Sequence, residues 1–186
     1  FDGFTATVSK AAYERLKSDP NLEVFEDRIY HIMLDGSAPL VNATFVPSLI
    51  YNGSNITGNG ISVCVIDTGI NYGHAALGGC TTAQFLAGTC AKVPGGYDYA
   101  NSDNDPYDDQ GHGSHVAGIV ASTDSTYRGV APNASIIAIK ACIPDGFGSA
   151  TCSTGAITSG IDWCVNNASR FNISVISMSL GTVATF

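Results

Sequence analysis

Residues 61–67 read Ile-Ser-Val-Cys-Val-Ile-Asp, a run of mostly β-branched side chains that ends on a carboxylate. A strand with one solvent-exposed face would alternate apolar and polar residues, whereas a strand covered on both faces forms a nearly continuous apolar run. We therefore expect Ile61–Ile66 to be a central strand of a parallel sheet. Asp67 follows it, at the edge of the sheet where open α/β folds bind their ligands.

The chain on the C-terminal side of this run repeats the pattern. Ala134–Ile139 predicts a second buried strand and Ile173–Met178 a third strand, and helical patterns follow Gly111 and cover Thr154–Asn166. Strands that alternate with helices predict an α/β fold, namely a doubly wound, mostly parallel sheet with helices on both faces. Residues 35–60 are rich in Gly, Asn, Ser and Pro and are expected to form an extended crossing segment.

The N-terminal part differs in composition. Charged side chains are more frequent in residues 1–33 than in the rest of the chain, which suggests a domain boundary. Residues 4–8 and 22–26 alternate like strands, and Ser9 can cap a helix over residues 10–17. These elements are too few to bury a core of their own, so we expect a partial α+β unit.

The overall composition argues against two classes of partner. Lys and Arg total 8 against 16 Asp and Glu, a net charge of −8, which opposes a phosphate-binding surface, so no nucleic-acid partner is expected. No apolar run reaches the roughly 20 residues that cross a bilayer, so no membrane span is expected. The high hydrophobic content, 45%, predicts a packed core.

Six cysteines without paired zinc-type spacing favour disulfides and an oxidising, extracellular compartment. Pairing Cys80 with Cys90 and Cys142 with Cys152 would close two short loops and leave Cys64 with Cys164. Six buried free thiols are the alternative, since connectivity does not follow from sequence. Glycosylation sequons, which also favour secretion, begin at Asn42, Asn52, Asn55, Asn133, Asn167 and Asn172.

Two motifs carry side chains suited to nucleophilic catalysis. Asp67 ends the first strand, and His112 opens the helix in the segment Gly-His-Gly-Ser-His-Val-Ala-Gly at residues 111–118. A carboxylate that accepts a hydrogen bond from one imidazole nitrogen leaves the other nitrogen free to deprotonate a serine hydroxyl. We expect Asp67 to orient the ring and His112 to act first as general base and then as general acid.

Together these segments resemble the subtilisin-like serine protease family. The resemblance rests on Val-Ile-Asp-Thr-Gly at 65–69, the 111–118 segment, and Val-Ile-Ser-Met-Ser-Leu-Gly at 175–181, in the order that the family has. It implies a secreted endopeptidase that hydrolyses peptide bonds of a polypeptide substrate through an Asp-His-Ser triad and an acyl-enzyme. Residues 34–186 would be the N-terminal part of the catalytic domain, and residues 1–33 the C-terminal part of an inhibitory propeptide cleaved near Met33 or Leu34.

The resemblance also assigns binding residues. One substrate-pairing strand would contain Ser179, Leu180 and Gly181, and the opposing strand Gly146, Phe147 and Gly148. A structural calcium ion is expected in the acidic segment before His112, because calcium accepts irregular sets of oxygen ligands. The candidate ligands are Asp98, Asn101, Asp103, Asp105 and the carbonyl of Tyr107.

The resemblance provides no nucleophile within these residues. Ser114, Ser177 and Ser179 each lie in a motif that gives them another role, and neither the family's serine turn nor its oxyanion asparagine is found. The chain alone is therefore expected to be inactive and to need the remaining part of the catalytic domain or another chain. The alternative is a non-catalytic relative that serves as a binding or structural module and assembles with a partner chain.

Overall fold

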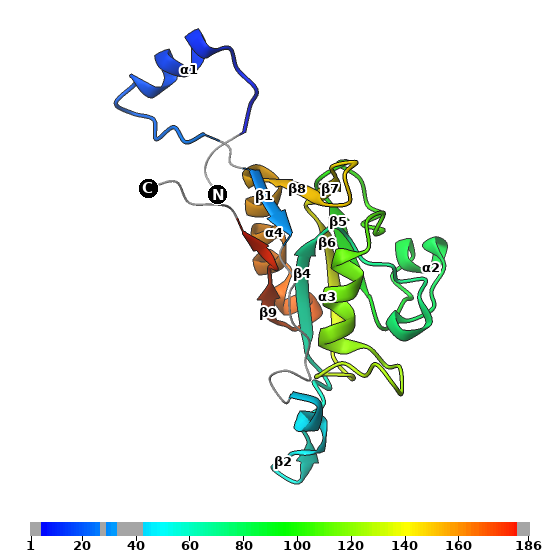
Figure 1. The fold of residues 1–186 in the computed structure, drawn as a ribbon. Coiled ribbons are helices and arrows are strands. Elements are labelled where there is room, and N and C mark those ends of the chain that lie inside the picture. Colours follow the sequence, from blue (N-terminus) through cyan, green and yellow to red (C-terminus); the bar gives the residue numbers. More distant parts are fainter. Residues whose placement is uncertain (1–4, 27–28, 33–42, 182–186) are drawn as a thin grey trace.

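The computed structural model describes residues 5–26, 29–32 and 43–181 (Figure 1). The helices and strands in chain order are α1 (Lys10–Lys17), β1 (Ile29–Ile32), the 3-10 helix η1 (Ala43–Ser48), β2 (Ile50–Tyr51), β3 (Ser54–Asn55), β4 (Ser62–Asp67), the 3-10 helix η2 (Ala75–Leu77), α2 (Thr82–Leu86), β5 (Gly95–Asp98), α3 (His112–Ala121), β6 (Ser135–Lys140), β7 (Cys142–Pro144), β8 (Ala150–Ser153), α4 (Thr154–Asn166), α5 (Ala168–Phe171), β9 (Ile173–Ser177) and β10 (Leu180–Gly181). The three strands predicted at 61–66, 134–139 and 173–178 and the helix predicted at 154–166 agree with these bounds to within one residue at each end, and a helix starts directly after Gly111 as expected.

A parallel sheet with the strand order β5-β6-β4-β9 forms the centre of the fold. The strand β4 pairs in parallel with β6 on one side and β9 on the other. Helix α3 covers one face of this sheet and α4 the other (Figure 1). The predicted α/β fold, a doubly wound parallel sheet with helices on both faces, is confirmed.

Strand β4 divides the core into two layers, because successive side chains of a strand point to opposite faces. Val63 and Val65 join the cluster that includes Val116 of α3. Cys64 and Ile66 join the cluster on the α4 side. All six residues of β4 are buried, as the continuous apolar run predicted.

The sequence reasoning missed strand β5. It begins with Gly95-Gly96 and has no β-branched residue, so it lacks the usual strand signal. The reason for a glycine is local crowding: a Cβ on Gly96 would lie 1.9 Å from the carbonyl oxygen of Ala138 in β6. The close approach to β6 therefore requires a glycine at position 96, which weakens the strand signal in the sequence.

A second, antiparallel sheet has the order β10-β1-β8-β7. In it, β1 lies between two strands from the other end of the chain: His31 is opposite Gly181 of β10, and Tyr30 is opposite Cys152 of β8. Strand β8 continues through the hairpin to β7. The N-terminal part of the chain thus inserts one strand between elements of the predicted catalytic part.

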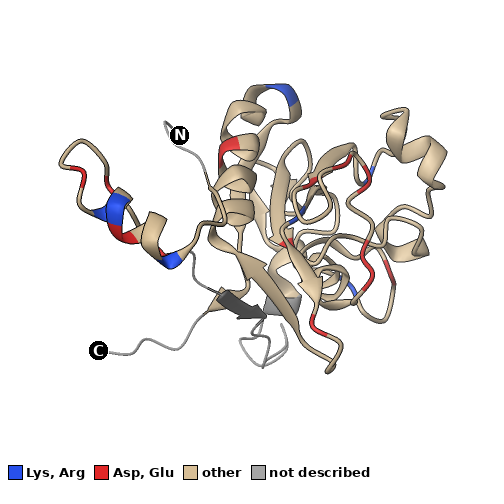
Figure 2. Cartoon of the chain, turned by 90° about the horizontal axis from the view of Figure 1, so that it is seen from above, with Lys and Arg blue, Asp and Glu red and all other residues tan. Residues whose placement is uncertain are grey.

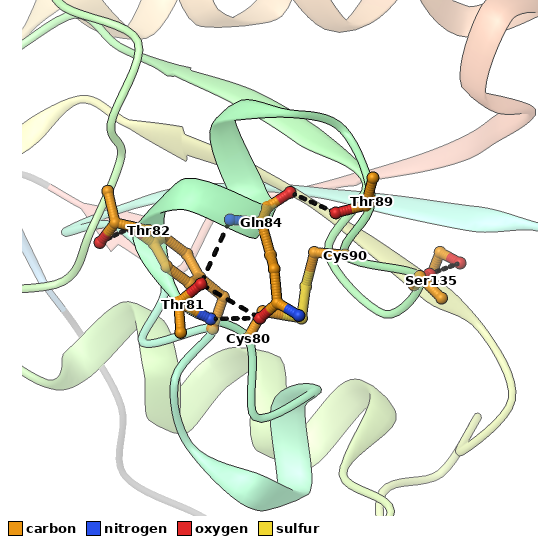
Figure 3. The surroundings of a disulfide bond; sticks show 9 residues. Cys80, Thr81, Thr82, Gln84, Thr89, Cys90 and Ser135 are labelled. Atoms are coloured by element: carbon orange, nitrogen blue, oxygen red, sulfur yellow. Dashed lines mark hydrogen bonds between the residues drawn. A yellow bond between two sulfur atoms is a disulfide. The ribbon is translucent and has the colours of Figure 1, made fainter.

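All three predicted disulfides are present: Cys64–Cys164, Cys80–Cys90 and Cys142–Cys152. The first ties β4 to α4 across the core. The second closes the loop that contains α2, where Thr81 and Gln84 form a capping box (Figure 3). The third joins β7 to β8.

The N-terminal segment gives a mixed outcome. Helix α1 covers residues 10–17, and the hydroxyl of Ser9 accepts a hydrogen bond from the N–H of Ala12, as predicted. The described residues near 4–8 and 22–26 form no strand, because alternation alone does not supply a partner to pair with. Figures 1 and 2 show α1 apart from the central sheet. The proposed boundary between residues 33 and 34 lies outside the described residues.

The segment before β4 forms a short hairpin of β2 and β3 rather than a fully extended crossing. Asn52 and Gly53, both with positive φ, make its turn. In the described part of the chain, Lys and Arg gather on α1 and are otherwise scattered, whereas Asp and Glu lie mainly on loops (Figure 2). Among the described residues, no helix is long and apolar enough to span a membrane.

Candidate active site

The end of β4 and the start of α3 bring Asp67 and His112 together. Asp67 is the last residue of its strand and His112 the first of its helix. The Nδ1 atom of His112 lies 2.7 Å from Oδ1 of Asp67, although 45 positions separate the two residues. The structure therefore places in direct hydrogen-bond contact the two side chains that the motifs assigned to one site.

Two glycines permit this approach of helix and strand. A Cβ on Gly113 would lie 2.2 Å from the carbonyl oxygen of Gly69 and 3.1 Å from Cβ of Asp67. Gly69 has φ of +104°, and a Cβ there would lie 2.5 Å from the carbonyl oxygen of Pro106. Both positions exclude a side chain because backbone atoms occupy the space.

Asp67 is fully buried, with 0% of its surface exposed. Burial raises the pKa of its carboxyl group, whereas the hydrogen bonds from His112 and from the N–H of Thr68, at 2.7 Å, act in the opposite direction. Two donors on Oδ1 thus stabilise the carboxylate, whereas Oδ2 is buried and has no hydrogen-bond partner among the described residues.

The contact also defines the tautomer of His112. Because Oδ1 of Asp67 accepts from it, Nδ1 carries a proton and Nε2 of a neutral ring has a free lone pair. Nε2 is buried and has no hydrogen-bond partner among the described residues. A base in this state can take a proton from a hydroxyl that lies within hydrogen-bond distance of Nε2.

Sequence reasoning missed Asp108, a buried carboxylate that joins β4 to α3. Its Oδ1 accepts a hydrogen bond from the hydroxyl of Thr68 at 2.9 Å, and that hydroxyl accepts from the N–H of Gly113 at 2.9 Å. The N–H groups of Gln110 and Gly111 also donate to Oδ1. The sequence did contain a signal for this role, because an Asp that lies shortly before the N-terminus of a helix commonly accepts hydrogen bonds from nearby backbone N–H groups.

The second oxygen of Asp108 engages Ser114. It accepts from the N–H of Ser114 at 2.9 Å and from its hydroxyl at 2.5 Å. The same hydroxyl oxygen accepts from the N–H of Asn71 at 2.8 Å. Ser114 therefore uses both its donor and an acceptor site to hold the loop after β4 against α3, which supports its exclusion as a nucleophile.

We expect Asp108→Asn to lower the free energy of unfolding by about 3 kcal/mol, because an amide group would face donors that a carboxylate satisfies. Denaturant unfolding measures the change. Asp124→Asn is the matched control, since Asp124 accepts two N–H groups in an exposed turn and its replacement should cost far less. Equal losses in the two variants would show that Asp108 is an ordinary loop residue.

The predicted substrate-binding residues fall into two groups. Leu180 and Gly181 form β10 and pair with β1, and Ser179 directly precedes them. Gly146, Phe147 and Gly148 do not form the opposing strand: they are an exposed turn, with both glycines at positive φ and Phe147 94% exposed. The strand that pairs with β1 is β8, which begins after the turn. The glycines therefore serve to reverse the chain between β7 and β8.

The acidic loop before α3 uses its side chains internally. Asp98 is buried, and its carboxylate accepts from the N–H groups of Ala100 and Asn101 and from the side-chain amide of Asn101. Asp103 accepts from the N–H of Asp105. No group of three or more His, Cys, Asp or Glu within the described ranges is arranged to hold a metal ion.

The remaining predicted ligands also have protein partners. Asp105 accepts from the hydroxyl of Tyr72 at 2.6 Å. The carbonyl of Tyr107 lies 3.4 Å from Nζ of Lys140, a buried ammonium that also pairs with Asp109. A cation already faces that carbonyl in this structure, and calcium binding by this loop stays a prediction.

Tyr72 provides a pH-dependent test of this loop. Burial, followed by the hydrogen bond to Asp105, raises the pKa of Tyr72 to about 12 from 10.0. The folded state keeps a proton that the unfolded state loses, so this contribution to stability is complete below pH 10 and is lost as pH rises through about 12. Burial also raises the pKa of Tyr99, so ultraviolet titration should show both tyrosines ionising later than the exposed ones, and Tyr72→Phe should remove the Tyr72 part of that late step. Ionisation of Tyr72 together with the exposed tyrosines would contradict the arrangement.

Comparison with known proteins assigns the family. The subtilase family model, Peptidase_S8, matches residues 58–185. This match covers more than half of the chain and includes the segments that hold Asp67 and His112, so the chain belongs to the subtilase family.

Individual relatives agree with this assignment. The chain is 34% identical over 190 residues to the serine protease AprX of Bacillus subtilis, covering 95% of this chain and 38% of the relative. It is 35% identical over 180 residues to subtilisin E of the same organism, covering 95% and 41%. Among solved structures, the CspB protease of Clostridium perfringens matches with a TM-score of 0.55 and 28% identity over 73% of this chain and 32% of that one. The chain therefore spans about two-fifths of the length of these curated relatives.

Proposed function

We propose that the protein to which these residues belong is a secreted serine endopeptidase that cleaves peptide bonds through an acyl-enzyme. The observation that carries this proposal is the 2.7 Å contact between Asp67 and His112 at the carboxyl edge of the parallel sheet. Membership of the subtilase family supports it. The hydroxyl nucleophile would come from outside these 186 residues, because Ser114 is engaged by Asp108 and the other candidate serines lie in the segment that leads to β10.

In this reaction His112 Nε2 would take the proton of the attacking hydroxyl and then deliver it to the leaving amine. Asp67 would hold Nδ1–H and stabilise the positive charge that develops on the ring. The burial of the carboxylate away from solvent strengthens this interaction. Neither step requires Asp67 itself to gain a proton.

A polypeptide substrate would bind as an extra strand. Strands β8 and β10 both present backbone hydrogen-bonding groups to the strand between them, which in this structure is β1. Strand addition of this kind accepts many sequences, because main-chain groups provide the affinity and side-chain pockets the selectivity. We propose that substrates take the place that β1 occupies.

Residues 1–33 would then act as an inhibitory segment. The support is that β1 fills the position between β8 and β10 and so excludes another strand from it. The expected processing point near Met33 or Leu34 lies outside the described residues. Release of this segment after cleavage would open the binding site.

A fluorophosphonate probe, which reacts with activated serine hydroxyls, tests the proposed function on the full-length protein. We expect one labelled serine outside residues 1–186 and loss of label after competition with a peptide substrate. The absence of any label in a folded protein that lacks the inhibitory segment would favour the alternative, a non-catalytic binding module.

The partner that completes the catalytic domain would join at β9. Of the central strands, β9 is at one end of the sheet, and Val175 on it is 51% exposed. A groove beside it is lined by Cys164, Val165, Ala168 and residues 173–176. A further strand at this edge would cover that groove and satisfy the unpaired backbone groups.

Secretion is supported by the three disulfides, which persist in oxidising compartments. Among the sequons, Asn52 is the best candidate for glycosylation, because it is exposed at the tip of the β2–β3 hairpin. Asn42 lies outside the described residues. Calcium binding by the acidic loop stays a prediction, and no step of the proposed mechanism involves it.

A further inference from the structure

We propose that the Cys142–Cys152 disulfide is a positioning device, which fixes the register of the substrate-pairing strand β8 relative to Asp67. This inference rests on the proposed function, in which a substrate replaces β1. Cys152 is opposite Cys142 on one side and opposite Tyr30 of β1 on the other. The cross-linked residue is thus also one against which a bound peptide would pair.

A short path connects this disulfide to the catalytic carboxylate. Strand β6 ends at Lys140, which is paired with Asp67 of β4. The N–H of the next residue, Ala141, donates to the carbonyl oxygen of Asp67 at 2.8 Å. Cys142 follows directly. The position of β8 along the binding site is therefore tied to β4 by one backbone hydrogen bond and one covalent bond.

Once β1 has left, the register of the β7–β8 hairpin depends, besides the disulfide, on its own short ladder and on the buried Ala150. Its strands contain three and four residues, and isolated two-stranded hairpins are marginally stable. Its tip is organised locally by Asp145, whose carboxylate accepts from the N–H groups of Phe147 and Ser149. Phe147 contributes no core contact at 94% exposure, whereas Cys142 and Cys152 are buried. A slip by one residue would turn every side chain of β8 to the other face.

The Cys80–Cys90 disulfide is a matched control. Each of the two bonds joins residues 10 positions apart, so the chain-entropy contribution to stability is the same for both. Cys80–Cys90 closes the loop around α2, and Ser135 beside it is the first residue of β6, at the opposite end of that strand from Lys140 (Figure 3). If each disulfide contributed only to stability, replacing both cysteines of either bond by alanine should have the same effect on the protein.

The experiment compares two amide substrates that share the residue before the cleaved bond, one with that residue alone and one extended to four residues. Only the extended substrate can pair with β8. In the active full-length protein, C142A/C152A is expected to raise KM for the extended substrate about tenfold, equivalent to one or two lost backbone hydrogen bonds. Its kcat, and both constants for the short substrate, should stay within about twofold of the wild type.

C80A/C90A should leave the ratio of the two KM values unchanged. If C142A/C152A does not fold, C142V/C152V keeps apolar contact across the strands without the covalent bond and should give the same shift. Equal changes for both substrates, or an unchanged KM ratio, would overturn the inference. Failure of the proposed function looks different, because then the wild type would neither hydrolyse the substrates nor react with the fluorophosphonate.

Discussion

His112→Ala in the active full-length protein is expected to lower kcat by about 10⁶-fold with little change in KM; the magnitude is that found for subtilisin, a member of the same family. The variant removes the ring that contacts Asp67 Oδ1 and can accept a proton from a nucleophile. Substrate pairing along β8 and β10 does not involve the ring, so ground-state binding should persist. Steady-state kinetics with an extended amide substrate measure both constants.

His115→Ala is the control for this variant. His115 lies one turn further along α3, and its backbone N–H bonds to the carbonyl oxygen of Gly111 as in any helix. Its replacement should leave kcat within about threefold of the wild type, as expected for a residue remote from the chemistry. A large loss with His115→Ala and a small one with His112→Ala would exchange the assigned roles.

Asp67→Asn is expected to lower kcat by about 10⁴-fold, as the equivalent change does in another Asp-His-Ser protease. An amide can present its N–H₂ group to Nδ1 of His112, which would hold the ring in the tautomer whose Nε2 already carries a proton. The ring could then no longer accept the proton of the attacking hydroxyl. The loss should become smaller at high pH, where a hydroxyl ionises without a base.

The control for Asp67→Asn is the unfolding free energy, because Asp67 is buried and its pKa is raised mainly by burial. A neutral side chain of the same shape removes a buried charge, so we expect a far smaller effect on stability than on kcat. Denaturant unfolding of the two proteins measures this. A variant that lost structure and activity in parallel would make Asp67 a structural residue.

The sequence predicted strands β4 and β6 well because both are covered on both faces. Strand β4 and strand β6 carry continuous apolar runs, and their ends at Asp67 and Lys140 agree with the prediction to within one residue. Strand β5 could not be found in this way. Its Gly96 is there because a side chain would collide with the carbonyl of Ala138 in β6, and glycine gives no strand signal. Contacts between distant segments leave no local pattern to read.

The reacting side chains of the site could be predicted from the sequence, but the hydrogen bonds that hold them in place could not. The motifs located Asp67 and His112, because catalytic chemistry demands those side-chain types at defined places. Asp108 was missed, since its importance depends on Thr68 and Ser114 arriving from two different elements. For the same reason the glycines at 146 and 148 suggested a strand but form the turn before β8.

The most direct test of the Asp67–His112 pair is ¹⁵N NMR of the full-length protein labelled at histidine, recorded above the pH at which the ring is charged. Nitrogen shifts and couplings show which ring atom carries the proton. The structure predicts that His112 is protonated at Nδ1 and unprotonated at Nε2, and that Asp67→Asn reverses this preference. A His112 ring protonated at Nε2 in the wild type, or a tautomer unaffected by Asp67→Asn, would contradict the catalytic pair.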